Sequence, residues 1–325
     1  MVTLISISMI ATNSMEVLLN IVLIIVGVSL VLNGADWLTK GASALARRMN
    51  IPEMVIGLTI VAAGTSAPEL FVSLVSALKG TPDMAVGNVV GSNTMNCMLI
   101  VGVAAMVAPM VISRSTVKKD IPFAVGASVL LLLLTFDGFL SITDGILLLL
   151  GFAAFMTYTL MQAKKGKTEP ESEQQPIGPW KSVALLLIGL VSLIGGSNIF
   201  VDSASSVAYA LGISEGMVGL TVVAGGTSLP ELATSVVAAR KGQSAIAIGN
   251  VIGSNVFNIL LILGLTATIS PLEIEGITTL DLAVMLLSVA LVWLFSFTRY
   301  TVERWEGALL VGGYGVYLWW LISNL

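Results

Sequence analysis

The chain contains no histidine and a single cysteine, Cys97, among its 325 residues. Zinc sites, disulfides and the Ser-His or Cys-His pairs of nucleophilic catalysis are therefore excluded or nearly so. The sequence also lacks the GxxxxGK[ST] pattern of a phosphate-binding loop, which argues against an ATP-driven pump. Most hydrolytic chemistry is thus excluded before any motif is considered.

Charged residues are scarce as well, because they make up only 10% of the chain, against roughly 25% in a soluble domain. The hydrophobic share is 56%, and the mean hydropathy is +0.98. This composition predicts a polytopic membrane protein. The first 15 residues carry no basic residue ahead of their apolar stretch, so we expect a short lead into the first span and not a signal peptide.

At about 20 apolar residues per span, hydropathy predicts an all-α fold with ten transmembrane helices. They are expected near residues 17–45, 54–79, 84–109, 121–136, 143–162, 181–211, 216–239, 245–269, 280–296 and 305–323. The only extended polar stretch, residues 163–180, has the Lys, Glu, Gln and Pro content of a flexible linker. It separates an N-terminal five-helix repeat, residues 1–162, from a C-terminal one, residues 181–325.

Basic residues predict which loops face the cytoplasm. With the N-terminus outside, 13 of the 15 basic residues lie in inward loops. These are Arg47, Arg48, Arg114, Lys118, Lys119, Lys164, Lys165, Lys167, Lys181, Arg240, Lys241, Arg299 and Arg304. We therefore predict a cell-membrane protein with both termini outside and residues 163–180 cytoplasmic. Because each half has an odd number of spans, the second half crosses the membrane in the opposite sense to the first, and the halves are inverted repeats. Inverted repeats are typical of secondary transporters with a site at the repeat interface.

One segment occurs twice in the chain. Residues 53–96 contain GLTIVAAGTSAPEL and GNVVGSNTMN, whereas residues 215–258 contain GLTVVAGGTSLPEL and GNVIGSNVFN. The copies are offset by 162 residues, and about 25 of 44 aligned positions are identical, which chance does not give. Glu69 and Glu231 are thereby predicted at membrane depth, where an unpaired charge costs about 2.5–3.5 kcal/mol or more. A bound cation would offset that cost.

Each copy also contains a proline that should break its helix. Pro68 has no amide hydrogen and its ring obstructs the carbonyl of Gly64, while Ala67 should leave the helical region because proline follows it. Pro230 should act in the same way, so helices 2 and 7 are predicted to be broken at the centre of the protein. A single Gly-Thr-Ser-Pro kink would indicate ordinary bending, but two copies that each end in an acid favour a functional site.

Oxygen ligands gather at the two breaks. Carbonyls freed around Ala62 and Ala224 survive at membrane depth only where they line a cavity or are buried in protein. The side chains that add oxygens are Thr65, Ser66, Glu69, Thr227, Ser228 and Glu231. An oxygen-only set suits hard cations such as Ca²⁺ or Na⁺.

The second element of each copy supplies further polar groups. Ser92 and Asn96 are four residues apart and share a helix face, and Ser254 and Asn258 repeat the pattern. Their oxygens would face the broken helices if the helices pack together. For four other asparagines, capping or bonding between helices is favoured over ligation: Asn88, Asn93, Asn250 and Asn255.

Three further residues are expected to have packing roles. Asp36 and Asp202 are predicted to make helix-end or helix–helix polar contacts, and a role in permeation is left open for both. Cys97 is predicted to face lipid or to pack inside the protein.

GTSAPE with GSNTMN, repeated as GTSLPE with GSNVFN in two five-helix halves, resembles the alpha repeats of the cation/Ca²⁺ antiporter superfamily, particularly prokaryotic sodium/calcium exchangers. The likeness covers nearly the whole chain. It implies a central site between inverted halves, opened to each side in turn as a pair of gating helices slides past a core. By motif position it implies Glu69 and Glu231 as shared Ca²⁺ and Na⁺ ligands, Thr65 and Thr227 with the carbonyls of Ala62 and Ala224 at the central site, and Ser66, Ser92, Ser228 and Ser254 at sodium sites.

One position departs from the family pattern. Well-known sodium/calcium exchangers carry aspartate at the position of Asn258, whereas both halves here carry asparagine, at Asn96 and Asn258. Two carboxylates balance one Ca²⁺, two Na⁺ or two protons, which strengthens the case for proton coupling. The proton/calcium branch resembles a different motif around its asparagines, which favours sodium.

We therefore expect a secondary antiporter that exchanges Ca²⁺ for Na⁺, with H⁺/Ca²⁺ exchange or another divalent cation as the alternative. An intramembrane aspartyl protease fits poorly, because glutamates in broken helices are ill suited to share a catalytic proton. A cation channel could use the same groups, but inverted halves favour alternating access. No cofactor and no nucleic-acid partner are expected. Ca²⁺ and Na⁺ bind as substrates, and the lipid bilayer surrounds the protein.

Overall fold

The computed structural model describes residues 2–165, 177–211 and 224–323, and the chain there is mostly helical. The first repeat contains α1 (Val2–Met49), α2 (Glu53–Ile56), η1 (Gly57–Val61), α3 (Ala62–Thr65), α4 (Ala67–Leu78), α5 (Pro82–Met95), η2 (Asn96–Ile100), α6 (Val101–Val107), η3 (Thr116–Asp120), α7 (Ile121–Leu134) and α8 (Ile142–Lys165). The second contains α9 (Pro179–Ala210), α11 (Ala224–Thr227), α12 (Leu229–Arg240), α13 (Ser244–Val256), η5 (Phe257–Leu263), α14 (Gly264–Ile269), α15 (Thr279–Phe297) and α16 (Arg304–Ser323). The η segments are π-helical.

Most helix bounds agree with the apolar runs, but α1 begins at Val2 and not near residue 17. Within the described ranges, six helices are long and apolar enough to cross a membrane, or seven if the bent pair is one span. That pair, residues 53–65 and 67–78, is bent by 46°. The predicted break of helix 2 is therefore confirmed, whereas the count of ten spans stays a prediction.

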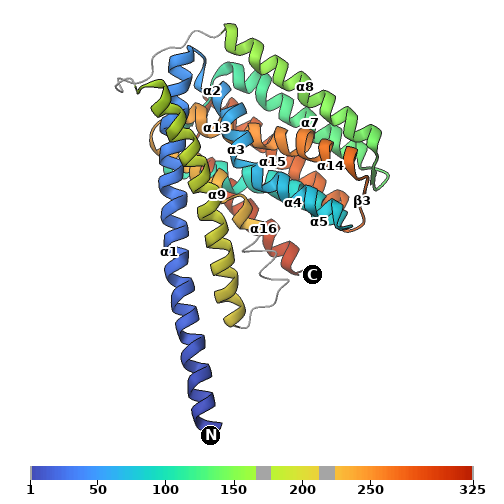
Figure 1. Ribbon diagram of the computed structural model, residues 1–325. Coiled ribbons are helices and arrows are strands. Elements are labelled where there is room, and N and C mark those ends of the chain that lie inside the picture. Colours follow the sequence, from blue (N-terminus) through green and yellow to red (C-terminus); the bar gives the residue numbers. More distant parts are fainter. Residues whose placement is uncertain (1, 166–176, 212–223, 324–325) are drawn as a thin grey trace.

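The helices that carry the second motif lie at the centre of the protein. In the most apolar 18-residue window of each helix, the share of buried residues is 78% within residues 82–107 and 94% within residues 244–269. The corresponding share in α1 is 17%. Figure 1 shows α13 surrounded by other helices, while α1 and α9 stand at the edge of the molecule. The motif asparagines and serines are therefore held inside the protein.

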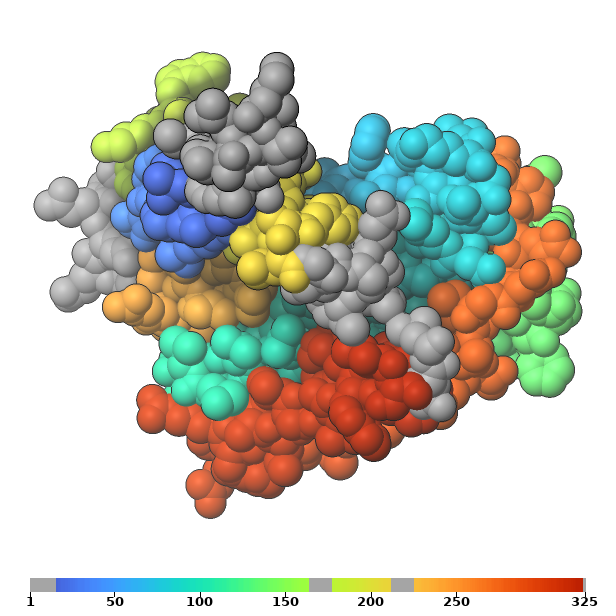
Figure 2. All heavy atoms as spheres, turned by 90° about the horizontal axis from the view of Figure 1, so that it is seen from below, coloured from blue at the N-terminus to red at the C-terminus, as the bar shows by residue number. Residues whose placement is uncertain are grey.

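Helix α1 packs most extensively against α9, along a line of glycines (Figure 1). A Cβ atom at Gly27 would lie 2.8 Å from the carbonyl oxygen of Gly196, and one at Gly34 would lie 2.8 Å from that of Gly189. Small residues let two helix backbones approach this closely. Because residue numbers rise along one helix as they fall along the other, the two helices are antiparallel. Figure 2 shows α1 in blue beside α9 in yellow, with α16 in red on another side of the molecule.

Contacts between the repeats occur in equivalent pairs, in which each residue is replaced by its counterpart 162 positions away in the other repeat. Strand β1 (Met110–Val111) pairs with β4 (Thr301–Val302), and β2 (Phe139–Leu140) pairs with β3 (Leu272–Glu273). Adding 162 to Met110 gives Leu272, and subtracting it from Val302 gives Leu140, so the Met110–Val302 pair recurs as Leu272–Leu140. The Gly27–Gly196 approach likewise recurs as Gly189–Gly34. Reciprocity of this kind is the property of a two-fold axis.

Candidate cation site

Both glutamates stand directly after a helix break. Glu69 lies in the first turn of α4 and Glu231 in the first turn of α12, and each is only 1% exposed. The chain leaves the helical region at Ser66 (φ −82°, ψ 7°) and at Ser228 (φ −90°, ψ 6°). The partial positive charge at a helix N-terminus stabilises a carboxylate in this position.

The break lies one residue earlier than the sequence predicts. Ala67 was expected to leave the helical region, but it is the first residue of α4 and Ser66 is the interruption. The physical reason is that Pro68 falls in the first turn of the new helix, where its missing N–H is not needed. The proline therefore starts the second piece and does not end the first.

Each carboxylate is held by a serine of the other repeat. The Ser66 hydroxyl donates to Glu231 Oε1 at 3.0 Å, and the Ser228 hydroxyl donates to Glu69 Oε1 at 3.2 Å. Ser254 also donates to Glu231 Oε1, at 3.5 Å. The two glutamates, 162 positions apart in the sequence, thus meet at one site between the repeats.

Four buried oxygens of the duplicated motif have no hydrogen-bond partner. Buried side-chain atoms without a partner include Glu69 Oε2, Glu231 Oε2, Asn96 Oδ1 and Asn258 Oδ1. Each of these four residues is 1% exposed. Buried polar oxygens are normally satisfied, and leaving one unpaired costs about 1–3 kcal/mol, or more for a charged group. Each repeat therefore contributes one unpartnered carboxylate oxygen and one unpartnered amide oxygen.

Neighbouring asparagines hold Asn96 and Asn258 in place. Asn96 donates through Nδ2 to Asn255 Oδ1 at 3.0 Å, and Asn258 donates through Nδ2 to Asn93 Oδ1 at 3.0 Å. Asn93 Nδ2 also donates to the backbone oxygen of Asn255 at 3.2 Å. The bonding role predicted for Asn93 and Asn255 is confirmed. These contacts use the amide nitrogens of Asn96 and Asn258 and leave their oxygens available.

Two asparagines bind the backbones of the glutamates, and each is also bonded to a serine that the sequence analysis did not single out. Asn88 donates to the backbone oxygen of Glu69 at 3.1 Å and to Ser73 Oγ at 2.9 Å. In the second repeat, Asn250 donates to the backbone oxygen of Glu231 at 3.3 Å and to Ser235 Oγ at 3.0 Å. The signal was present, since each serine follows its glutamate by four residues in both copies.

Thr65 and Thr227 end the short helices that precede the two breaks, whereas Ser92 and Ser254 lie within α5 and α13. Thr65 donates to Asn250 Oδ1 at 2.9 Å, and Thr227 interacts with the Glu69 carboxyl group. Ser92 is 5% exposed and Ser254 is fully buried. Ala224 begins α11, in whose last turn Gly226 accepts a hydrogen bond from Ser197 of α9 through its backbone oxygen.

The carbonyl of Ala62 is not freed as predicted. It accepts a hydrogen bond from the backbone N–H of Ser66 at 3.0 Å, because α3 stays helical up to Thr65. A carbonyl oxygen has a second lone pair. The Thr65 hydroxyl also donates to this oxygen, at 3.4 Å, so the Ala62 carbonyl is not the open backbone group that the sequence predicted.

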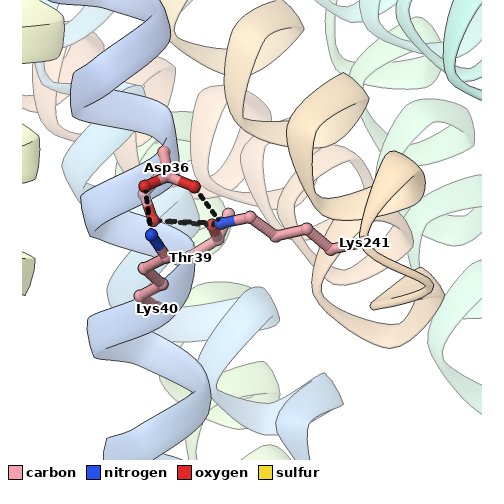
Figure 3. A network of polar contacts seen from close by, with 4 residues as sticks. All are labelled: Asp36, Thr39, Lys40 and Lys241. Atoms are coloured by element: carbon pink, nitrogen blue, oxygen red, sulfur yellow. Dashed lines mark hydrogen bonds and ion pairs between the residues drawn. The ribbon is translucent and has the colours of Figure 1, made fainter.

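Asp36 lies in a separate polar cluster that joins α1 to the end of α12 (Figure 3). Its two carboxylate oxygens pair with Lys40 at 2.7 Å and with Lys241 at 2.8 Å. Lys241 also donates to Thr39 Oγ1 at 2.7 Å. Asp36 is therefore a helix–helix contact, as predicted.

Two other predicted packing residues can now be placed. The side chain of Asp202 is exposed on α9. Cys97 is fully buried, and its sulfur lies 2.9 Å from Asn255 Nδ2. It therefore packs inside the protein and does not face lipid.

Comparison with known proteins identifies the family. The model of the family described as sodium/calcium exchanger protein matches residues 19–161 and again residues 181–323. The chain belongs to the sodium/calcium exchanger family. The family resemblance carried by the two motifs is thereby confirmed, and so is the prediction that the chain is a membrane protein.

Two relatives and one solved structure match this chain along almost their whole length. The inner membrane protein YrbG of Escherichia coli is 40% identical over 318 residues, covering 94% of this chain and 98% of its own. The sodium/calcium exchanger MaX1 of Methanosarcina acetivorans is 33% identical over 340 residues, covering 92% and 97%. The solved structure of the sodium-calcium exchanger NCX_Mj soaked with zero Na⁺ and Ca²⁺ superposes with a TM-score of 0.83 at 32% identity, covering 94% and 99%.

Proposed function

We propose that this exchanger is a secondary antiporter that moves Ca²⁺ against Na⁺ by alternating access, at a site built on Glu69 and Glu231. The observation that carries the proposal is the set of four buried oxygens without a partner, two on glutamates and two on asparagines. They come in equal numbers from the two repeats. A site of that kind, at the interface of two repeats, is the arrangement of a secondary transporter.

Ca²⁺ and the driving ion compete for the same carboxylates, so one leaves before the other binds. Glu69 and Glu231 are the direct charged ligands in this proposal. The neutral oxygen donors are Ser66, Ser92, Ser228, Ser254, Thr65, Thr227, Asn96 and Asn258, with the carbonyls of Ala62 and Ala224. An empty site that carries two buried charges resists the change of access, and an occupied one permits it. Ca²⁺ and the driving ion are therefore exchanged for each other, and neither crosses the membrane alone.

The proposed architecture has ten spans in two inverted five-helix repeats, residues 1–162 and 181–325, joined by a linker over residues 163–180. The reciprocal contacts across the offset of 162 support this division. The separate matches of the family model to the two halves support it as well. The antiparallel course of α1 and α9, which are equivalent helices, supports the inversion.

The coupling ion is tested by flux into liposomes that contain the purified protein. Ca²⁺ uptake is measured with an outward Na⁺ gradient at uniform pH, and then with an outward H⁺ gradient in the absence of Na⁺. Uptake driven by Na⁺ alone supports the proposal. Uptake driven only by H⁺ favours the alternative, because two protons also neutralise two carboxylates. Absence of uptake under both gradients contradicts Ca²⁺ exchange.

A further inference from the structure

We infer that Asp36, Thr39 and Lys241 form a lock that holds α1 against α12 in one of two access states, the state that this structure describes. This role rests on the proposed function, because only an alternating-access transporter has two such states. It depends on contacts that the second repeat does not reproduce, and it lies outside the proposed cation site.

The ammonium group of Lys241 is bound entirely by α1 (Figure 3). It pairs with Asp36 Oδ1 at 2.8 Å, and it donates to the backbone oxygen of Asp36 at 3.1 Å and to Thr39 Oγ1 at 2.7 Å. An ammonium group has three N–H donors, so one neighbouring helix uses all of them. Because Lys241 directly follows the last residue of α12, the lock ties the end of α12 to α1.

The second repeat cannot build the same lock. Across the offset of 162, the counterparts of Asp36, Thr39, Lys40 and Lys241 are Asn198, Val201, Asp202 and Lys79. Asn198 carries no charge, and Val201 has no polar side-chain atom. The acid at Asp202 stands one helical turn further along α9, at the position of Lys40. The lock is therefore specific to one repeat, unlike the duplicated motif.

The packing of the two repeats differs in the same way. Helix α1 packs against α12, whereas the equivalent helices, α9 and α4, make no comparable contact within the described ranges. Ala233 of α12 is 8% exposed, while its counterpart Phe71 of α4 is 70% exposed. Lys79, at the end of α4, is also exposed and forms no ion pair with the described part of the chain. The α1–α9 pair therefore lies toward α12 in this structure.

This asymmetry distinguishes one access state from the other. In a transporter made of two inverted repeats, exchanging the conformations of the repeats opens the site to the opposite side. A contact that one repeat makes and the other lacks is therefore present in one state and broken in the other. We expect α1 to leave α12 when α9 approaches α4, and Lys241 then releases Asp36.

Lys40 makes the lock reversible. It lies on α1 four residues after Asp36, and its Nζ is 2.7 Å from the second carboxylate oxygen. Because Lys40 moves with α1, Asp36 keeps a cationic partner after Lys241 has left, and no unpaired acid is created at membrane depth. Lys241 is 22% exposed and lies at a helix end, where its charged group regains water. Partly exposed ion pairs are weak, so the lock should favour its state by about two- to fivefold.

The experiment measures the position of α1 relative to the rest of the protein by double electron–electron resonance. Spin labels are attached to the full chain at Met49→Cys on α1 and Trp305→Cys on α16, both exposed, in a background lacking Cys97. Helix α16 is a suitable reference because it packs against α6, which also packs against α12. Ca²⁺ is present so that the change of state is permitted. Asp36→Asn and Lys241→Met should each raise the second distance population, relative to the dominant one, by about two- to fivefold.

Matched variants separate the lock from a general loss of structure. Lys79→Met, at the repeat counterpart, and Asp36→Glu, which keeps the carboxylate, should leave the native distances unchanged. Unchanged distances in both Asp36→Asn and Lys241→Met overturn the lock, and so does an equal shift caused by Lys79→Met. If either variant fails to fold, Thr39→Val copies Val201 and should give a smaller shift in the same direction, and no shift overturns the lock. Absence of Ca²⁺ uptake in the gradient experiment contradicts the proposed function, whereas the distances decide the lock by themselves.

Discussion

Ser66 donates a hydrogen bond to Glu231 across the interface between the repeats, and Ser228 returns the same contact to Glu69. Neither repeat therefore holds its own carboxylate by this contact. A movement of one break relative to the other changes both carboxylates together, since each is tied to the opposite break. This reciprocity explains why the chain needs both copies of the motif to build one site.

The line of glycines between α1 and α9 predicts a sharp difference between two adjacent positions. A Cβ at Gly196 would lie 2.7 Å from Leu30 Cβ and 2.8 Å from the Gly27 carbonyl oxygen, whereas one at Gly195 meets nothing within 4 Å. Gly196→Ala should lower stability by about 1–3 kcal/mol through overpacking. Gly195→Ala, the matched control, should be neutral or stabilising by up to about 1 kcal/mol, because alanine favours helix. Thermal unfolding in detergent measures both, and equal melting temperatures would contradict the close packing.

The ion pair between Lys241 and Asp36 predicts a modest, specific loss of stability. The two side chains are 22% and 32% exposed, so the pair is worth about 1 kcal/mol and not more. Lys241→Met should lower the melting temperature, and the loss should shrink in an Asp36→Asn background. Lys79→Met is the control, because Lys79 is the repeat counterpart of Lys241. An equal loss with and without Asp36 would mean that the ion pair contributes nothing.

Asp120 predicts a pH-dependent effect on stability. It lies just before α7, where burial raises the pKa of its carboxyl group to about 6, against the partial compensation of Thr116 and Lys119. The folded pKa lies above the unfolded one, so the stabilisation is present at low pH and is lost as pH rises through about 6. Asp120→Asn should therefore stabilise the protein by about 1–2 kcal/mol at pH 8 and by much less at pH 4. Melting curves at the two pH values test this, with exposed Asp202→Asn as control. An equal effect of Asp120→Asn at both pH values would contradict the raised pKa of this buried carboxyl group.

The distribution of basic residues predicts that the linker over residues 163–180 is cytoplasmic. A cysteine introduced at position 170, in a background lacking Cys97, should react with an impermeant thiol reagent only after cells are permeabilised. Cysteines near either terminus should react in intact cells and serve as the control for reagent access. Labelling of position 170 in intact cells would reverse the orientation.

The residues proposed for the site can be identified from the sequence because duplication marks them twice. The shared motif placed Glu69, Glu231, Asn96 and Asn258 together without any structure, and the structure shows unpartnered oxygens on these four residues. Apolar runs also gave most helix bounds, since burial and lipid exposure both require apolar residues.

The contacts that depend on three-dimensional packing were not predictable in the same way. Lys241 reaches Asp36 across 205 positions, and no local pattern encodes that distance. The break at Ser66 was placed one residue late because the rule for residues before proline describes a tendency, whereas the first turn of a helix accepts proline. The carbonyl of Ala62 was expected to be free because the sequence does not show that α3 continues to Thr65.

The central claim is that Glu69 and Glu231 together bind the transported cation. The measurement that tests it most directly is Ca²⁺ uptake into liposomes by Glu69→Gln and Glu231→Gln, compared with the native protein and with Asp202→Asn at the exposed surface of α9. Each glutamine removes one of two charges at nearly constant volume, so uptake should fall to the level of protein-free liposomes while the protein still elutes as a folded species. Asp202→Asn should transport normally. Near-native uptake by either glutamine variant would contradict the shared site.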